Sequence, residues 1–213
     1  MSRRVVVALL GPVTWSPPGV DPARWRTALA EDVVDLLATL NEVETAVAVT
    51  AEDRWLADAV VWPGTAVYEV TEPTPNAVFA AVAAGRHTSK ADGRQAGYDQ
   101  VAVVAADAPD VPGLTLGKLL RPLTTRPVAL APAEGGGTGL LGVAARLPVP
   151  AWLPALDLDT TEPAEVRRAA PSPGDVAVTA GWRRMRGPAD LAALDPAVEG
   201  WETTRALLSG RPV

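Results

Sequence analysis

The sequence predicts an α/β protein, a three-layer sandwich in which helices cover both faces of a mainly parallel, mixed sheet. Two observations lead to this fold class. Apolar runs alternate with helical patterns through residues 1–130, which is the order of β–α–β units and therefore of parallel strands. Residues 127–144 then hold two apolar runs joined by a glycine-rich segment, so the sheet should be mixed. We expect residues 1–213 to form a single domain.

The elements of the first half follow from apolar spacing and capping residues. Residues 5–10 are a continuous apolar run, which is typical of a central strand covered on both faces. Asp21 and Pro22 predict an N-cap and a first helical position, and apolar residues follow from Trp25 to Leu40 at helical spacing. The next expected elements are a strand at 43–50, a helix at 51–60, a strand at 66–70, a helix at 75–84 and a strand at 100–106.

The second half is predicted from shorter patterns. Residues 114–120 have helical spacing, and Pro122 is expected to end that helix. The polar residues 85–97 are expected to form a loop or a frayed helix end, in which His87 is exposed rather than catalytic. The other expected elements are strands at 127–130 and 140–144, a helix at 162–169, a strand at 176–179, and helices at 189–194 and 199–208.

The composition excludes several classes of function. The formal net charge of -6 opposes nucleic-acid and anionic-membrane partners, because both require a basic surface. The chain has no cysteine and one histidine, which excludes disulfides, thiol nucleophiles and multi-histidine metal sites within one chain. No apolar run approaches the ~18 residues of a membrane span, so the expected location is the cytoplasm.

Asp107 and Asp110 are the first candidate site, as catalytic residues. Asp107 directly follows the predicted strand at 100–106, and ligands of open α/β sheets bind outside the carboxyl ends of the strands. Two acids three residues apart can converge on one Mg²⁺ that also takes substrate phosphate oxygens. The alternative is that both acids cap the helix near residue 114, or hold a turn ahead of Pro109 and Pro112.

A glycine-rich segment is the second candidate, as a substrate-binding loop. Its glycines allow backbone N–H groups to approach a ligand closely and to cradle an anion. The alternative is a wide hairpin connection without a ligand. The expected substrate-binding residues are Glu134, Gly135, Gly136, Gly137 and Thr138, together with Gly11 of the first loop.

Asp157 and Asp159 form the third candidate. If they lie on a strand, they face the same way and could share a cation, so Asp159 joins Asp107 as an expected metal ligand. The alternative is an exposed strand edge, or a cap for a helix near Thr161.

The first loop, residues 11–19, contains no Lys or Arg. Arg24 and Arg26 lie one turn into the next predicted helix and could reach back to hold an anion, although such residues more often form the solvated face of a helix. Trp15 is the tryptophan expected to touch a ligand, because it lies within this loop.

Residues 98–110, which end in Ala106-Asp107-Ala108-Pro109-Asp110, and residues 128–142, around the glycines, resemble segments of a known superfamily. It is the nucleotide-diphospho-sugar transferase fold superfamily. Within it, the chain is most similar to the bacterial glycosyltransferase-like family named for domain of unknown function 2064. The 2-phospho-lactate and phosphoenolpyruvate guanylyltransferases are relatives of that family. The resemblance covers about residues 4–195.

The resemblance implies a metal site and also shows departures from the family pattern. The first Asp of the family's strand-end motif binds the metal, and Asp107 matches it. The family's first loop carries Lys and Arg that grip phosphates, whereas this chain has Trp15 followed by Ser-Pro-Pro. The acidic residue before the paired glycines is replaced by Gly135, and the late segment before Asp190 has lost its leading Asp.

Two functions follow from these observations. One is a transferase dependent on Mg²⁺ or Mn²⁺ that acts on a nucleotide or nucleotide-sugar, with Asp107 holding the metal and Asp110 or Asp159 assisting. The other is a non-catalytic homologue of the same fold that binds a metabolite or a partner protein. An NAD-binding protein is not expected, because no Gly-x-Gly-x-x-Gly follows the first strand.

Overall fold

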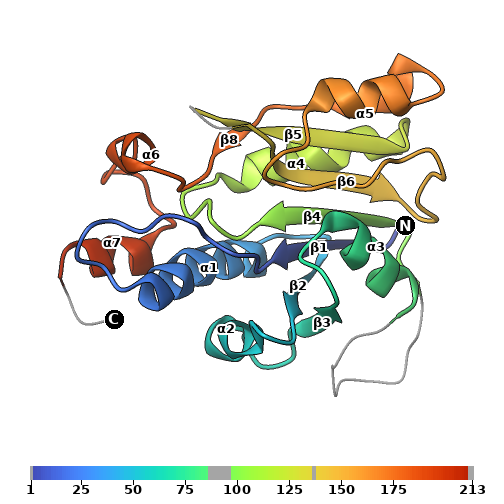
Figure 1. Ribbon diagram of the computed structural model, residues 1–213. Coiled ribbons are helices and arrows are strands. Elements are labelled where there is room, and N and C mark those ends of the chain that lie inside the picture. The colour runs from blue at the N-terminus through green and yellow to red at the C-terminus, as the bar shows by residue number, and fades with distance from the viewer. Residues whose placement is uncertain (1, 86–96, 136–137, 211–213) are drawn as a thin grey trace.

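The computed structural model describes residues 2–85, 97–135 and 138–210 (Figure 1). The strands in these ranges are β1 (Arg4–Leu9), β2 (Glu44–Thr50), β3 (Ala66–Val70), β4 (Gln100–Ala105), β5 (Val128–Glu134), β6 (Leu140–Arg146), β7 (Val176–Val178) and β8 (Trp182–Arg183). The helices are α1 (Pro22–Ala38), α2 (Arg54–Val60), α3 (Pro75–Ala83), α4 (Gly113–Leu120), η1 (Arg121–Thr124), α5 (Pro163–Ala169), η2 (Pro173–Asp175), α6 (Pro188–Ala192) and α7 (Glu202–Leu208). The described part of the chain holds no helix with the length and apolarity that a bilayer crossing requires.

The sheet has the order β3-β2-β1-β4-β6-β5-β7, and β8 pairs with β5. Among the described strands β6 runs against its neighbours β4 and β5, while the other pairs are parallel. This confirms the mainly parallel, mixed sheet. The chain moves outward from β1 to β3 and then returns to place β4 on the other side of β1, so the direction of winding reverses between β1 and β4.

Helices cover both faces of the sheet, as a three-layer sandwich requires. Because side chains alternate along a strand, Val6 and Ala8 face one way and Val5 and Val7 the other. The first face packs against apolar residues of α1, α2 and α4. The second face packs against α3, α5 and the segment around Leu156.

Capping residues set the starts of two long helices. Asp21 Oδ1 accepts a hydrogen bond from the backbone N–H of Arg24 at 2.9 Å, as the Asp21-Pro22 pair predicts for α1. Thr74 does the same for α3 through the N–H of Ala77. Each cap satisfies an N–H group that has no partner within the helix.

Several element predictions need correction. Strand β5 extends to Glu134, beyond the predicted residue 130, because it pairs with β6 through a register shift at Pro132. Helix α4 ends at Leu120, as predicted from Pro122, although a 3₁₀ turn, η1, that contains Pro122 continues from it. The short strand β8 was not predicted. The prediction for His87 falls outside the described residues.

Candidate functional site

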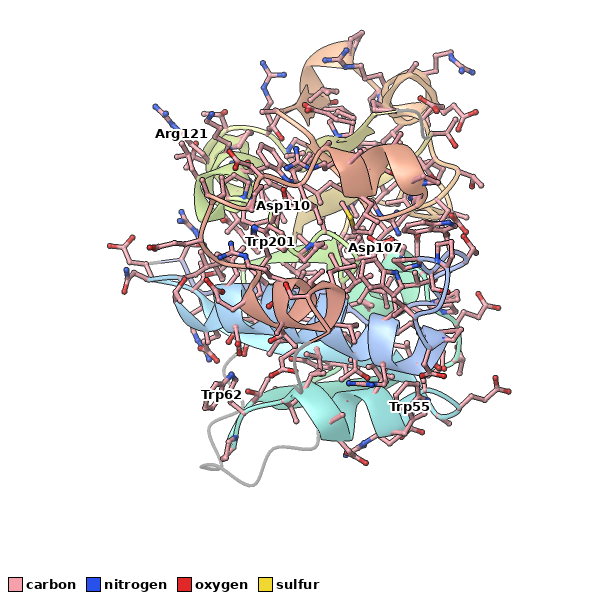
Figure 2. The ribbon with its side chains drawn as sticks, turned by 90° about the vertical axis from the view of Figure 1, so that its left-hand side faces the viewer. Trp55, Trp62, Asp107, Asp110, Arg121 and Trp201 are labelled. Atoms are coloured by element: carbon pink, nitrogen blue, oxygen red, sulfur yellow. The ribbon has the colours of Figure 1, made fainter. Side chains whose placement is uncertain are left out.

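A cleft lies at the carboxyl ends of β1 and β4, where the winding of the sheet reverses. Ligands of open α/β sheets bind at this position. Both strands point to the left in Figure 1, toward the end where α6 lies. Figure 2 looks onto that end, and Asp107 and Asp110 lie near its middle. Two adjoining hollows of about 80 and 220 Å³ share Pro12, Val13, Asp107 and Asp159, and together they reach the lower end of the size range of small-molecule sites.

Asp107 is buried and paired with Arg184. Its Oδ1 accepts a hydrogen bond from Arg184 Nε at 2.6 Å, and its Oδ2 accepts one from Nη2 at 2.9 Å. This is the two-pronged geometry in which a guanidinium binds a carboxylate most strongly. Helix α4 begins after Pro112 without a side-chain cap, so the alternative in which Asp107 and Asp110 cap this helix is wrong.

The guanidinium of Arg184 also contacts Leu140, Leu158 and Asp159. Its Nη1 donates to the carbonyl oxygens of Leu140, at 3.1 Å, and Leu158, at 2.9 Å. The same nitrogen lies 2.9 Å from Asp159 Oδ1. The two carboxylates expected to share a metal, Asp107 and Asp159, therefore do converge, but the cation between them is an arginine.

A second guanidinium, that of Arg186, continues the network toward solvent. Its Nη2 donates to Asp159 Oδ1 at 2.8 Å, and its Nη1 donates to the carbonyl oxygen of Thr138. Burial lowers the pKa of Arg186, and repulsion by Arg184 lowers it further. Burial also lowers the pKa of Arg184, but attraction by Asp107 and Asp159 outweighs burial, and the net shift is upward. Both guanidiniums are charged at neutral pH.

The side chain of Asp110 binds residues of β8 and does not line the cleft. It accepts a hydrogen bond from Trp182 Nε1 at 3.0 Å and forms an ion pair with Arg183, both in β8. Asp110 is outside the set of residues that line the two hollows in the described structure. Asp110 thus anchors β8 through these two contacts. Its carboxylate is not brought together with that of Asp159.

Asp157 and Asp159 lie on a turn, so their expected strand is wrong. Asp157 Oδ1 accepts hydrogen bonds from the backbone N–H groups of Asp159, at 2.6 Å, and Thr160, at 3.1 Å. Aspartate commonly stabilises such a turn by replacing a backbone acceptor. The turn still directs Asp159 to the cleft, where it meets Arg184 and Arg186.

The glycine-rich segment connects the paired strands β5 and β6, and of its described residues Thr138 contacts the edge of the cleft through Asp159 and Arg186, whereas Glu134 and Gly135 do not line the two hollows. Thr138 Oγ1 donates to the carbonyl oxygen of Asp159 at 3.1 Å. Gly139 has φ of +93°, and a Cβ atom there would lie 2.4 Å from the carbonyl oxygen of Leu158, so only glycine fits. Glu134 is the last residue of β5 and Gly135 follows it, while Gly136 and Gly137 fall outside the described residues.

The first loop meets the cleft through its backbone. Gly11 lines the cleft, and its carbonyl oxygen accepts a hydrogen bond from Arg26 Nη2 at 3.1 Å. Arg26 therefore reaches back to the first loop, while its Nη1 binds Asp53 at 2.9 Å, and its contact with an anion stays a prediction. Trp15 was expected to touch a ligand, but it packs edge-on against Trp25, with ring centroids 6.0 Å apart.

Arg184 and Arg186 are the site residues that the sequence patterns did not reveal. They come from a run of three arginines within residues 183–186, which is unusual in an acidic chain. That run, next to the segment that departs from the family pattern, is the signal that could have drawn attention to them. The pairing itself joins residues 77 positions apart and has no local signature.

The fold matches those of solved structures. One is a protein from Desulfovibrio desulfuricans described as a nucleotide-diphospho-sugar transferase, with a TM-score of 0.63, 18% identity and 100% coverage of both chains. The chain has the nucleotide-diphospho-sugar transferase fold. CMP:2-keto-3-deoxy-manno-octonic acid synthetase in complex with CTP is similar at a TM-score of 0.51 and 15% identity, over 98% of each chain. Rv0371c of Mycobacterium tuberculosis in complex with manganese is similar at a TM-score of 0.54 and 16% identity, over 98% of each chain.

No family model and no curated protein matches the sequence. The likeness to these solved structures shows the fold, and the resemblance to the superfamily stays a prediction. The narrower resemblance to the domain of unknown function 2064 family and to the guanylyltransferases stays a prediction.

Proposed function

We propose that this protein binds a nucleotide or nucleotide-sugar in the cleft between the carboxyl ends of β1 and β4. The observation that carries the proposal is the convergence of Asp107, Asp159, Arg184 and Arg186 at this position of a transferase fold. A similar fold binds CTP in the synthetase named above.

Arg186 is the group best placed to receive a phosphate of the ligand. Its side chain is 21% exposed, whereas the side chain of Arg184 is 6% exposed. A guanidinium at the edge of a cleft forms strong, charge-assisted hydrogen bonds with phosphate oxygens. The backbone of Thr138 and Gly11 would then line the two sides of the ligand.

The described residues, as they are arranged, do not fit a divalent metal at Asp107. Mg²⁺ and Mn²⁺ bind carboxylate oxygens directly, but both oxygens of Asp107 accept hydrogen bonds from Arg184. Asp159 Oδ1 is likewise shared by Arg184 and Arg186. In the described part of the chain no cluster of three or more acidic or histidine side chains offers another such site.

This arrangement favours the non-catalytic alternative, in which the cleft binds its ligand without metal-dependent transfer. The expected Mg²⁺- or Mn²⁺-dependent transferase remains the second candidate. Its support is that Asp107 and Asp159 do meet around a single cation position, as two metal ligands would.

Calorimetric titration with nucleoside triphosphates and nucleoside-diphosphate sugars tests the proposal. We expect one of these ligands to bind, and Arg186→Gln to weaken its binding about 10- to 100-fold, the effect of losing a hydrogen bond from a charged group. Arg121→Gln is the matched control, because Arg121 is exposed and lies away from Asp107 (Figure 2). Absence of binding across the panel, or equal effects of the two variants, would contradict the proposal.

A further inference from the structure

We infer that Arg184 is a built-in cation that takes the place of a divalent metal in this cleft, so that ligand binding here needs no metal. The starting observation is the number of segments that meet at this one side chain. Its guanidinium binds Asp107 after β4, Leu140 at the start of β6, and Leu158 and Asp159 on the turn at 157–159. A bridging metal would join the same carboxylates.

The neighbours of Arg184 fix its position. On one side Arg183 is held by Asp110, and on the other side the backbone N–H of Met185 donates to the carbonyl oxygen of Asp107 at 2.7 Å. Met185 is itself fully buried, against Trp25 and Leu29 of α1. Because both flanking residues are anchored, the backbone at Arg184 is fixed in a position from which its side chain reaches Asp107.

The charges at this point are already balanced. Asp107 and Asp159 contribute two negative charges, and Arg184 and Arg186 contribute two positive charges. A divalent cation placed among them would lie next to two guanidiniums, and like charges a few ångströms apart repel strongly at a buried site. Binding of a metal at Asp107 thus requires Arg184 to be displaced.

The guanidinium differs from a metal in what it can do for a ligand. It supplies one positive charge and directional N–H donors, so it holds an anionic group by hydrogen bonds rather than by direct coordination. It also stays charged at all physiological pH values. We therefore expect the affinity for a nucleotide or nucleotide-sugar to be the same, within twofold, with EDTA and with Mn²⁺.

Electron paramagnetic resonance of Mn²⁺ titrated into the full chain tests the claim about the metal directly. We expect wild type and Asp107→Asn to take up Mn²⁺ equally, since surface carboxylates alone contribute. Arg184→Met removes the cation, and we expect it to gain Mn²⁺ binding at least about tenfold tighter than wild type, because a repelling charge is lost. Adding Asp107→Asn to Arg184→Met should abolish that gain.

Arg184→Lys is the matched control, because it keeps a positive charge at the same position and should gain no Mn²⁺ binding. Mn²⁺ uptake by wild type that Asp107→Asn removes would overturn the inference. So would a folded Arg184→Met that gains no Mn²⁺ binding. If Arg184→Met does not fold, the comparison of Mn²⁺ uptake by wild type and by Asp107→Asn is sufficient to test the inference.

The inference about ligand affinity rests on the proposed function, whereas the inference about metal does not, so their failures can be told apart. If no nucleotide binds and Mn²⁺ uptake is independent of Asp107, the proposed function fails and the built-in cation stands. If a nucleotide binds only when Mn²⁺ is present, the proposed function stands and the built-in cation is overturned.

Discussion

Two roles can be considered for Asp107, and a single substitution would not separate them. As a metal ligand, which the sequence predicts, its loss would abolish metal-dependent binding. As the partner of Arg184, its loss leaves a buried guanidinium without two of its hydrogen bonds. Stability has to be measured beside binding before any effect of this residue on a ligand is interpreted.

We predict that Asp107→Ala lowers the free energy of unfolding by about 3–5 kcal/mol, the usual effect of removing one partner of a buried ion pair. Urea denaturation followed by circular dichroism measures it. Asp58→Ala is the control, because the Asp58 side chain is 63% exposed in its pair with Arg54, and such pairs contribute less than about 1 kcal/mol. Equal effects of the two substitutions would show that the Asp107 pair is not buried as described.

Asp107 was predictable at the level of the residue, and Arg184 was not. The apolar run before Asp107 fixes a strand, and the position after a parallel strand fixes which end of the sheet its side chain faces. Arg184 follows a strand of two residues, too short for an apolar pattern. Its partner Asp107 follows a different strand, β4, so no spacing within the sequence points to the pair.

At the scale of elements, the close approach of β6 to the turn at 157–159 depends on Gly139. The backbone N–H of Leu140 donates to the carbonyl oxygen of Leu158 at 2.8 Å, and this carbonyl also accepts from Arg184. A side chain at Gly139 would push the turn away and disturb both hydrogen bonds.

We therefore predict that Gly139→Ala lowers the free energy of unfolding by about 1–3 kcal/mol, because alanine is strained at this positive φ and has no room. Gly117→Ala is a matched control. Gly117 lies inside α4, and a Cβ atom there meets nothing within 4 Å, so alanine should stabilise by about 0.5–1 kcal/mol. Chemical denaturation of both variants checks the opposite signs, and equal signs would contradict the contact.

Helix α7 is joined to α1 by a buried carboxylate. Asp32 accepts hydrogen bonds from the backbone N–H groups of Thr203 and Thr204, each at 2.9 Å. Burial raises the pKa of Asp32 above its ordinary value, although these hydrogen bonds oppose the shift. The folded state therefore binds the proton of Asp32 more tightly than the unfolded state does.

The sign of the pH effect follows from this shift. The stability that Asp32 contributes is greatest below about pH 4, where an unfolded aspartate is protonated, and it falls as the pH rises through the raised pKa. We predict that wild type loses stability relative to Asp32→Asn as the pH rises from 4 toward neutrality, so that the unfolding free energy of wild type minus that of Asp32→Asn falls. Urea denaturation across this range measures it, and a constant difference would contradict the raised pKa.

At the scale of the whole molecule, the fold was more predictable than the site. Buried strands such as β1 and β4 are apolar runs that the sequence places to within about one residue, and their alternation with helices gives the parallel sheet. The cleft instead assembles Gly11, Asp107, Asp159 and Arg184 from distant parts of the chain. Which of these carboxylates meets which cation depends on three-dimensional packing rather than on sequence spacing.

The central claim concerns the identity of the cation between Asp107 and Asp159. Crystals of the wild-type chain soaked with Mn²⁺ and a nucleotide, with anomalous scattering recorded for manganese, test it most directly. We expect no manganese peak between these two carboxylates and an Arg184 side chain still bound to both oxygens of Asp107. A manganese ion coordinated by Asp107, with Arg184 displaced, would contradict it.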